Sequence, residues 1–332
     1  MQPPFPSPTP TWHNDTYPAI SPQRPELSTT GKTVVITGAG SGIGRETAVA
    51  FASAKAARVV LLGRTKAALE ETAKLLPDTV PTSIFVVDVT QEKGLTEAAS
   101  SIGAWDILVL NAGYVSTPAP VGSSDTHEWW QGFETNVKGT FLCIKAFLPT
   151  ANKSHATILA VTSGIAAAPS AMLPGVSAYI SSKLAQTKMI EYVSSENPNV
   201  FAATVHPGVY MTNITKKSGA KEGDLPLDHI QLAGHFLVWM SSPEARFLDG
   251  RSVWANWDVD ELKASAQTIQ SGILMTSGYA LTMSMYFANR AVLTKKLLAW
   301  AAAFDAAMQA GRIRKALADS DLPPLGPVTL ED

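Results

Sequence analysis

A tyrosine and a lysine four positions apart, in Tyr179-Ile180-Ser181-Ser182-Lys183, are the side chains best suited to acid–base chemistry in this sequence. Residues four apart lie on the same face of a helix, so the phenol of Tyr179 and the ammonium of Lys183 would be neighbours. Near the start of the chain lies a glycine-rich segment, Thr37 to Gly44, of the kind that receives a dinucleotide. Together they predict transfer of a hydride to or from a carbinol carbon and of a proton to or from its oxygen. In isolation, a Tyr–Lys pair at this spacing would more often be a solvated helix face.

The glycine-rich segment is interpreted from its neighbours along the chain. The short β-branched run Thr33–Thr37 precedes it, and helical apolar spacing follows from Ile43 to Ala54. A strand, a glycine turn and a helix in this order form the context that a dinucleotide fingerprint requires. Glycine lets backbone N–H groups approach the pyrophosphate, and the helix N-terminus adds unpaired donors. The spacing Gly38-x3-Gly42-x-Gly44 differs from the commonest pattern. A glycine-rich connection without a ligand is therefore the alternative, which the strand–helix context disfavours.

At these motifs the chain resembles the short-chain dehydrogenase/reductase family. The matching motifs are T-G-x3-G-x-G at Thr37 to Gly44, N-A-G at Asn111-Ala112-Gly113, Y-x3-K at Tyr179 and Lys183, and P-G at Pro207-Gly208, with Thr212 at the usual offset beyond. Their order over some 180 residues makes the resemblance specific, and it covers roughly residues 31 to 255. The preceding arm, with Trp12 to Tyr17, looks like that of fungal members of the family.

The resemblance implies a catalytic set of four residues, Tyr179, Lys183, Ser163 and Asn136. Tyrosine has an ordinary pKa of about 10, so acid–base work near neutrality needs a depression worth roughly 4 kcal/mol. We expect Lys183 to lower the pKa of Tyr179 by favouring the phenolate. Ser163, expected to end the fifth strand, would hydrogen-bond the substrate oxygen, and Asn136 would complete a proton relay through water. Ser163 precedes Tyr179 by sixteen residues where the family usually has about thirteen, so the loop Ala166–Val176 is longer than typical.

The resemblance also implies which residues contact a nicotinamide dinucleotide. They are Gly38, Ser41, Gly42, Ile43, Gly44, Arg64, Asp88, Val89, Asn111, Ala112, Gly113, Tyr179, Lys183, Pro207, Gly208 and Thr212. Asp88-Val89, expected at the end of the third strand, would face the adenine, and Thr212 would hold the nicotinamide carboxamide. The second strand runs into Gly63-Arg64-Thr65 with no acid at its end, and Arg64 is a donor suited to a 2′-phosphate. We therefore expect NADP, with NAD as the alternative, because Ser41 stands where many NADP-using relatives carry a second basic residue.

Composition excludes several other classes of function. The 26 basic and 28 acidic side chains nearly cancel, and no basic stripe suggests nucleic acid as a partner. The single cysteine, Cys143, is expected to be a buried apolar residue. The proline-rich N-terminus lacks the apolar stretch of a signal peptide, so a cytoplasmic location is expected. We expect no transmembrane segment, because even the most apolar stretch, Ile273 to Ala288, is interrupted by polar residues. No metal-binding residues are assigned.

Strand-like and helix-like runs alternate, which predicts right-handed crossovers around a parallel sheet. Strands are expected at Thr33–Thr37, Arg58–Leu62, Ser83–Val89, Asp106–Leu110, Ala156–Thr162, Val200–Val205 and Arg251–Trp254, and helices at Ile43–Ala54, Ala67–Leu76, Glu92–Ser101, Glu128–Leu148, Ala178–Ser195 and Ile230–Met240. The fold class expected is α/β, a Rossmann-type doubly wound seven-stranded parallel sheet, and the resemblance implies the strand order 3-2-1-4-5-6-7. Residues 1–30 are expected to form an extended arm, residues 31–258 the catalytic domain, and residues 259–332 a helical extension that includes Ala291–Ala318.

The residues expected around the substrate carry little charge. They are Ala166–Pro169, Met172–Pro174, Tyr114, Tyr210 and Met211. This lining suits an apolar ketone or secondary alcohol better than a sugar phosphate or an organic acid. The family also implies a homodimer or homotetramer. The rival class is a non-catalytic nucleotide-sensing scaffold, but such scaffolds typically lose the tyrosine or the lysine, and this chain keeps both.

Overall fold

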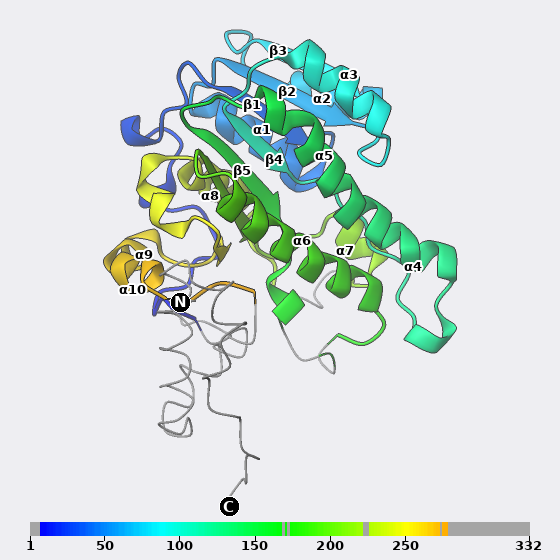
Figure 1. Ribbon diagram of the computed structural model, residues 1–332. Coiled ribbons are helices and arrows are strands. Elements are labelled where there is room, and N and C mark those ends of the chain that lie inside the picture. Colours follow the sequence, from blue (N-terminus) through cyan, green and yellow to red (C-terminus); the bar gives the residue numbers. More distant parts are fainter. Residues whose placement is uncertain (1–6, 168–169, 171–172, 222–225, 273, 278–332) are drawn as a thin grey trace, which may run out of the picture. The chain divides into compact units, whose positions relative to one another are not determined.

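The computed structural model describes residues 7–167, 170, 173–221, 226–272 and 274–277 (Figure 1). The chain forms two compact units, Met1–Met283 and Ser284–Asp332, and everything described lies in the first. The helix expected at Ala291–Ala318 lies outside the described residues, and the division of the chain at residues 30 and 258 stays a prediction. Within the part that is described, no helix is both long and apolar enough to cross a bilayer.

A seven-stranded parallel sheet forms the centre of the first unit. Its strands are β1 (Thr33–Thr37), β2 (Arg58–Gly63), β3 (Thr82–Val86), β4 (Ile107–Leu110), β5 (Ala156–Val161), β6 (Val200–His206) and β7 (Ser252–Trp254). The spatial order β3-β2-β1-β4-β5-β6-β7 confirms the expected topology. Val34 of β1 pairs with Val59 on one side and with Ile107 on the other. The order reverses between β1 and β4, and ligands of such sheets bind beyond the carboxyl ends of the strands at this point.

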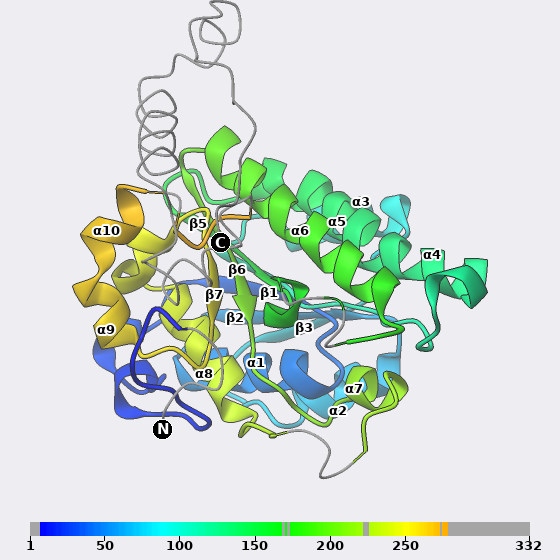
Figure 2. The same ribbon diagram turned by 90° about the horizontal axis from the view of Figure 1, so that it is seen from below.

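Helices cover both faces of the sheet. The α-helices are α1 (Gly42–Ser53), α2 (Lys66–Ala73), α3 (Glu92–Ile102), α4 (Thr126–Phe133), α5 (Gly139–Phe147), α6 (Ser177–Glu196), α7 (Asn213–Lys217), α8 (Gln231–Met240), α9 (Val259–Ala264) and α10 (Ala266–Gln270). One π-helical segment, η4 (Glu134–Lys138), joins α4 to α5. The 3₁₀ segments are η1 (Pro18–Ile20), η2 (Pro25–Leu27), η3 (Val121–Ser123), η5 (Leu148–Thr150), η6 (Gly164–Ala167) and η8 (Pro243–Leu248). In Figure 2, α3, α5 and α6 lie on one side of the strands, and α1, α2 and α8 on the other.

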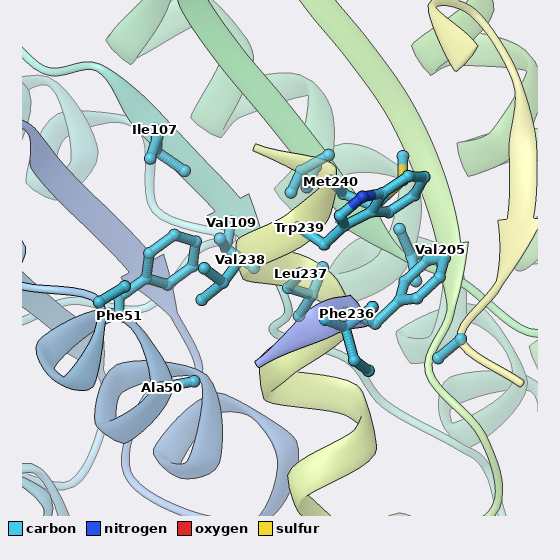
Figure 3. Packing of buried hydrophobic residues seen from close by; sticks show 14 of the residues in the cluster. Ala50, Phe51, Ile107, Val109, Val205, Phe236, Leu237, Val238, Trp239 and Met240 are labelled. Carbon is cyan, nitrogen blue, oxygen red and sulfur yellow. The ribbon is translucent and has the colours of Figure 1, made fainter. Parts of the chain in front are cut away.

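Each face of the sheet has its own apolar core. On one face, Phe51 of α1 packs with Phe236 and Trp239 of α8 over β4 and β6, and all three side chains are fully buried (Figure 3). Helices α1 and α8 approach each other closely at Gly234, where an added Cβ would lie 3.0 Å from the Cβ of Ala50. On the other face, the buried Phe147 of α5 packs in a second cluster. Each such fully buried large side chain stabilises the fold by about 1.5–3 kcal/mol.

Two strands end earlier than expected, which changes the position of two candidate residues. Strand β3 ends at Val86, opposite Gly63 at the end of β2, so Asp88 and Val89 follow the strand instead of ending it. Strand β5 likewise ends at Val161, two residues before Ser163. At Val86 the neighbouring strand β2 also ends, and at Val161 the neighbouring strand β4 has already ended. These residues therefore lie in the connections beyond the carboxyl edge of the sheet.

The arm before β1 packs against the segment that follows β7. Trp12 forms a β-bridge with Trp257, and the imidazole of His13 lies 2.9 Å from the carboxylate of Asp258. Further along, Ile20 and Leu27 are fully buried in the core between the arm and the helices. These contacts fix the arm beside the segment that follows β7.

Candidate functional site

A cavity of about 840 Å³ lies beyond the carboxyl ends of β1, β2, β3 and β4. Of the residues expected to contact a dinucleotide, eleven line it: Gly38, Ser41, Gly42, Ile43, Arg64, Asp88, Val89, Asn111, Ala112, Gly113 and Thr212. The other five, Gly44, Tyr179, Lys183, Pro207 and Gly208, are not among the residues that line this cavity. Side chains of α4, including His127, Trp130 and Gln131, line its far wall, which the sequence did not predict.

The glycine turn is shaped by close contacts of the main chain. Gly38 and Gly42 have φ angles of +66° and +51°, values that residues with a side chain rarely adopt. A Cβ on Gly44 would lie 2.3 Å from the carbonyl oxygen of Gly38, so Gly44 packs beneath the turn instead of facing the cavity. Ser41 caps α1 without using its side chain, which leaves the first N–H groups of the helix to a ligand. This cradle fits the pyrophosphate of a dinucleotide.

Asn111 holds the turn to the neighbouring strand. Its side-chain amide donates to the carbonyl oxygens of Thr37 at 3.0 Å and Gly38 at 3.2 Å. The hydroxyl of Thr37 accepts in return from the backbone N–H groups of Asn111 and Ala112, each at 3.0 Å. Asn111 therefore ties β1 to β4 as well as lining the cavity.

Arg64 and Asp88 lie together at the end of the cavity formed by β2 and β3. The guanidinium of Arg64 is 3.9 Å from the carboxylate of Asp88, and the Arg64 side chain is 68% exposed. The carboxylate of Asp88 also accepts from the N–H and the hydroxyl of Thr90 at 2.9 and 2.8 Å. A second arginine near the turn, Arg45, is already bonded to the Gly40 carbonyl oxygen at 2.6 Å. Of these two arginines, Arg64 alone lines the cavity.

Tyr179 and Lys183 lie on the first turns of α6, beside Ser163. The hydroxyls of Tyr179 and Ser163 share a hydrogen bond, and the ammonium of Lys183 lies 5.9 Å from the centre of the Tyr179 ring. Burial raises the pKa of Tyr179 to about 12, and the bond to Ser163 lowers it in part. Burial also lowers the pKa of Lys183 to about 7. The expected depression of the tyrosine pKa is thus not found here, because desolvation of the phenolate outweighs the neighbouring groups.

Asn136 is fully buried in the π-helical segment between α4 and α5. Its side-chain amide accepts from the N–H of Tyr114 at 2.8 Å and donates to the Tyr114 carbonyl oxygen at 2.9 Å. The same amide donates to the hydroxyl of Ser182 at 2.9 Å, on α6 beside Lys183. Asn136 therefore joins the loop after β4 to the helix that carries Tyr179 and Lys183.

The P-G turn after β6 lies beside a buried network. Gly208 has a φ of +105°, and a Cβ there would lie 2.6 Å from the carboxylate of Asp228 and from the hydroxyl of Tyr210. That hydroxyl donates to the Pro207 carbonyl oxygen at 2.5 Å, so Tyr210 supports the turn. Of the segments expected around the substrate, residues 168–169 and 171–172 lie outside the described residues.

Two groups of functional interest were not predicted from the sequence. Lys217 of α7 donates to the hydroxyl of Tyr114 at 2.7 Å and to the carboxylate of Glu128 at 3.0 Å, which links α7 to α4 at the same end of the sheet (Figure 2). Hydrogen bonds from the Thr117 N–H, Lys217 and Tyr114 lower the pKa of Glu128 to about 2. The second group is the buried pair Gln186 and Thr140. Gln186 lies three residues after Lys183, a helical spacing from which its proximity could have been inferred.

Comparison with known proteins agrees with this geometry. A family model described as short chain dehydrogenase matches residues 32–223. The short chain dehydrogenase mpl6 of Monascus purpureus is 35% identical over 282 residues, which cover 79% of this chain and 94% of that protein. A short chain dehydrogenase of Shigella flexneri, complexed with NADP, has a TM-score of 0.64 and 23% identity, over 69% of this chain and 98% of its own.

A 3-ketoacyl-ACP reductase of Sinorhizobium meliloti is 28% identical with a TM-score of 0.60, over 68% of this chain and 98% of its own. The family match covers the segment that contains the cavity, Ser163, Tyr179 and Lys183. It also agrees with the similarity to the fungal protein over most of both chains. This chain is therefore an oxidoreductase of the short-chain dehydrogenase/reductase family.

Proposed function

We propose that this protein interconverts a ketone and a secondary alcohol, using NADP(H), on an apolar small molecule. Two observations carry the proposal: Ser163, in the connection after β5, lies with Tyr179 and Lys183 of α6, and a cavity at the carboxyl edge of the same sheet has a glycine turn that fits a dinucleotide. Bound nicotinamide dinucleotide would supply or accept the hydride. It would be held by the glycine turn, Asp88-Val89, Asn111-Ala112-Gly113 and Thr212, which all line the cavity.

The side chains at the site divide the work on the substrate oxygen. In the reduction, the hydroxyl of Tyr179 donates a proton to the oxygen, and Ser163, already hydrogen-bonded to that hydroxyl, holds the oxygen in place. Loss of this proton leaves a phenolate in a buried site, which is costly unless positive charge lies nearby. The ammonium of Lys183, one turn further along α6, provides such a charge. Asn136 keeps the loop after β4 in register with α6.

Turnover of a panel of ketones and alcohols, followed by the nicotinamide absorbance, tests this proposal. The proposed enzyme oxidises NADPH with an apolar ketone in the panel, or reduces NADP with the matching alcohol. A non-catalytic nucleotide-sensing scaffold would bind the dinucleotide in a direct binding assay without turning over any member. Binding without turnover across aliphatic, aromatic and polycyclic ketones would therefore contradict the proposal and favour the scaffold.

We expect Arg64→Ala to weaken the use of NADPH by about ten- to a hundredfold and to leave that of NADH almost unchanged. The substitution removes a charged hydrogen-bond donor from the part of the cavity at the end of β2, and no acidic residue stands at the end of that strand. A charged hydrogen bond is worth about 1.5–3 kcal/mol. Support for NADP also comes from the solved structure of a relative that is complexed with NADP.

The measurement is kcat/KM for both cofactors, with Lys66→Ala as the matched control. Lys66 is two residues away and 72% exposed, and it pairs with Glu70 instead of lining the cavity. Its removal tests whether net charge alone affects binding. Equal losses with NADPH and NADH in Arg64→Ala, or a parent enzyme that prefers NADH, would show that Arg64 does not select the cofactor.

We also expect a homodimer or homotetramer assembled through the layer of α5 and α6. Phe141 of α5 is 50% exposed and Tyr192 of α6 is 59% exposed, although both are large and apolar. The double variant Phe141→Glu with Tyr192→Glu should shift the protein to monomers in light scattering coupled to size exclusion. Leu75→Glu, at a residue that is 57% exposed and outside this layer, is the control and should leave the mass unchanged. A parent protein that is already monomeric would contradict the prediction.

A further inference from the structure

Buried hydrogen bonds connect Lys183 to the main chain of Asn136 without a gap. The ammonium of Lys183 donates to the Val161 carbonyl oxygen at 2.7 Å and to Oε1 of Gln186 at 2.9 Å. Nε2 of Gln186 donates to the hydroxyl of Thr140 at 2.9 Å. That hydroxyl donates to the Asn136 carbonyl oxygen at 2.8 Å. Lys183, Gln186, Thr140 and Asn136 are each at most 4% exposed.

The groups at the two ends of this series of hydrogen bonds determine which atom donates in each of them. A carbonyl oxygen can only accept, so the Thr140 hydroxyl must donate to Asn136 and accept from the amide of Gln186. The NH₂ group of Gln186 therefore faces Thr140, and its oxygen faces Lys183. Among the described residues, Lys183 meets two acceptors and no competing donor. These hydrogen bonds favour the ammonium over the neutral amine and offset part of the cost of its burial.

We propose that Gln186 is a positioning residue for the reaction of Tyr179. Its amide, anchored by Thr140 to the Asn136 carbonyl, holds the Lys183 side chain in its charged form beside the phenol. The inference rests on the proposed function and deepens it, because it assigns the link between the lysine and the helical asparagine to two side chains of the protein. An amide does not readily pass a proton, so Gln186 acts by orientation and by stabilising charge.

The groups around the ammonium limit what else could keep it charged. They are the Val161 carbonyl of β5, the Gln186 oxygen of α6, and the ring of Tyr179 one turn earlier. Burial lowers the pKa of Lys183, and among the described residues no carboxylate beside the ammonium counteracts this effect. Loss of the Gln186 oxygen should therefore lower this pKa further, leave less positive charge near Tyr179, and make its phenolate harder to form.

Gln186→Leu tests the proposal, because leucine keeps most of the volume and removes the acceptor. We expect roughly tenfold lower kcat at neutral pH, a nearly unchanged KM for the ketone or alcohol, and an acid limb of alcohol oxidation that moves to higher pH by about one unit. Thr187→Val is the matched control. Thr187 is the next residue of α6, is also buried, and bonds to Thr162 and to the Lys183 carbonyl, not to the ammonium. Its loss should affect stability and leave the pH profile in place.

A second measurement does not depend on turnover. The pH titration of the Lys183 side chain by NMR, in protein with ¹³C at lysine Cε and with the signal assigned through Lys183→Arg, gives its pKa directly. We expect a lower value in Gln186→Leu and a higher one in Gln186→Glu, which places a carboxylate against the ammonium. If the leucine variant does not fold, the glutamate variant still gives a result.

The outcomes separate this inference from the proposed function. An unchanged Lys183 pKa in both Gln186 variants would overturn the inference, even in an active enzyme. Equal loss of kcat at every pH in Gln186→Leu, matched by Thr187→Val, would also overturn it, since it would indicate packing alone. A parent protein that turns over no ketone would contradict the proposed function, and the NMR titration would still show whether Gln186 holds the charge.

Discussion

Tyr179→Phe is expected to lower kcat by about 10²–10⁴-fold while leaving the dissociation constant of the cofactor nearly unchanged. The substitution removes one oxygen and keeps the ring, so packing at the start of α6 is preserved. It deletes the proton that the reduced substrate oxygen requires, together with the hydrogen bond to Ser163. Single-turnover rates with a saturating ketone, and cofactor binding measured by fluorescence, give the two quantities separately.

Tyr192→Phe is the matched control for this substitution. Tyr192 lies on the same helix and is 59% exposed, so removal of its hydroxyl should leave kcat unchanged. A Tyr179→Phe enzyme that works as fast as its parent would show that another group moves the proton. A large loss of cofactor binding in the same variant would show instead that the Tyr179 hydroxyl mainly supports the cofactor.

Lys183→Met is expected to abolish most activity and at the same time to stabilise the folded protein at neutral pH. Burial holds the pKa of Lys183 at about 7, below its ordinary value of 10.5, so the fold disfavours the charged form. The unfolded chain therefore binds more protons between about pH 7 and 10.5, and the free energy of unfolding rises with pH in this window. Methionine removes this cost. Its gain is offset in part by the two acceptors left unpaired, Val161 and Gln186, for a net of about 1–3 kcal/mol.

Chemical denaturation from pH 7 to about 9.5, below the ordinary titration of tyrosine, measures this effect. The parent should gain stability across the range, and Lys183→Met should show a flatter dependence. Lys188→Met is the control, because Lys188 is on the same helix, 48% exposed and paired with Glu191. If the free energy of unfolding depends on pH in the same way in the parent and in Lys183→Met, burial does not lower the pKa of Lys183. The buried charge of Lys183 that lowers the stability of the fold is also the charge that stabilises the Tyr179 phenolate. Activity and stability therefore favour different side chains at this position.

The sequence predicted best what depends on local pattern. The β-branched run before Gly38 and the helix after it are specified within one segment, and the observed β1 and α1 agree with the expected ranges to within a residue or so. The order of the strands followed from family resemblance and is confirmed. The expected ends of β3 and β5 were wrong, because they depend on pairing with other strands: Val86 pairs with Gly63, the last residue of β2, and Val161 lies one residue beyond the last pair with β4.

Features of the site that depend on packing were not predictable. The helix expected over Glu128–Leu148 contains a π-helical segment around Asn136, next to Gly139, where a Cβ would lie 2.8 Å from Val89 on another connection. The bond between Gln186 and Thr140 joins residues 46 apart in the sequence. Motifs also gave the direction of the Tyr179 pKa incorrectly, because burial of the phenol cannot be read from its spacing to Lys183.

Transfer of deuterium tests the central claim most directly. NADPH carrying deuterium at both positions of nicotinamide C4 is incubated with the enzyme and an accepted ketone, and the alcohol is analysed by mass spectrometry. For the parent enzyme, we predict one deuterium on the carbinol carbon of the product. We predict little labelled product from Tyr179→Phe at equal cofactor occupancy. Labelled alcohol formed by Tyr179→Phe at the rate of the parent, or alcohol formed without the label, would contradict the account.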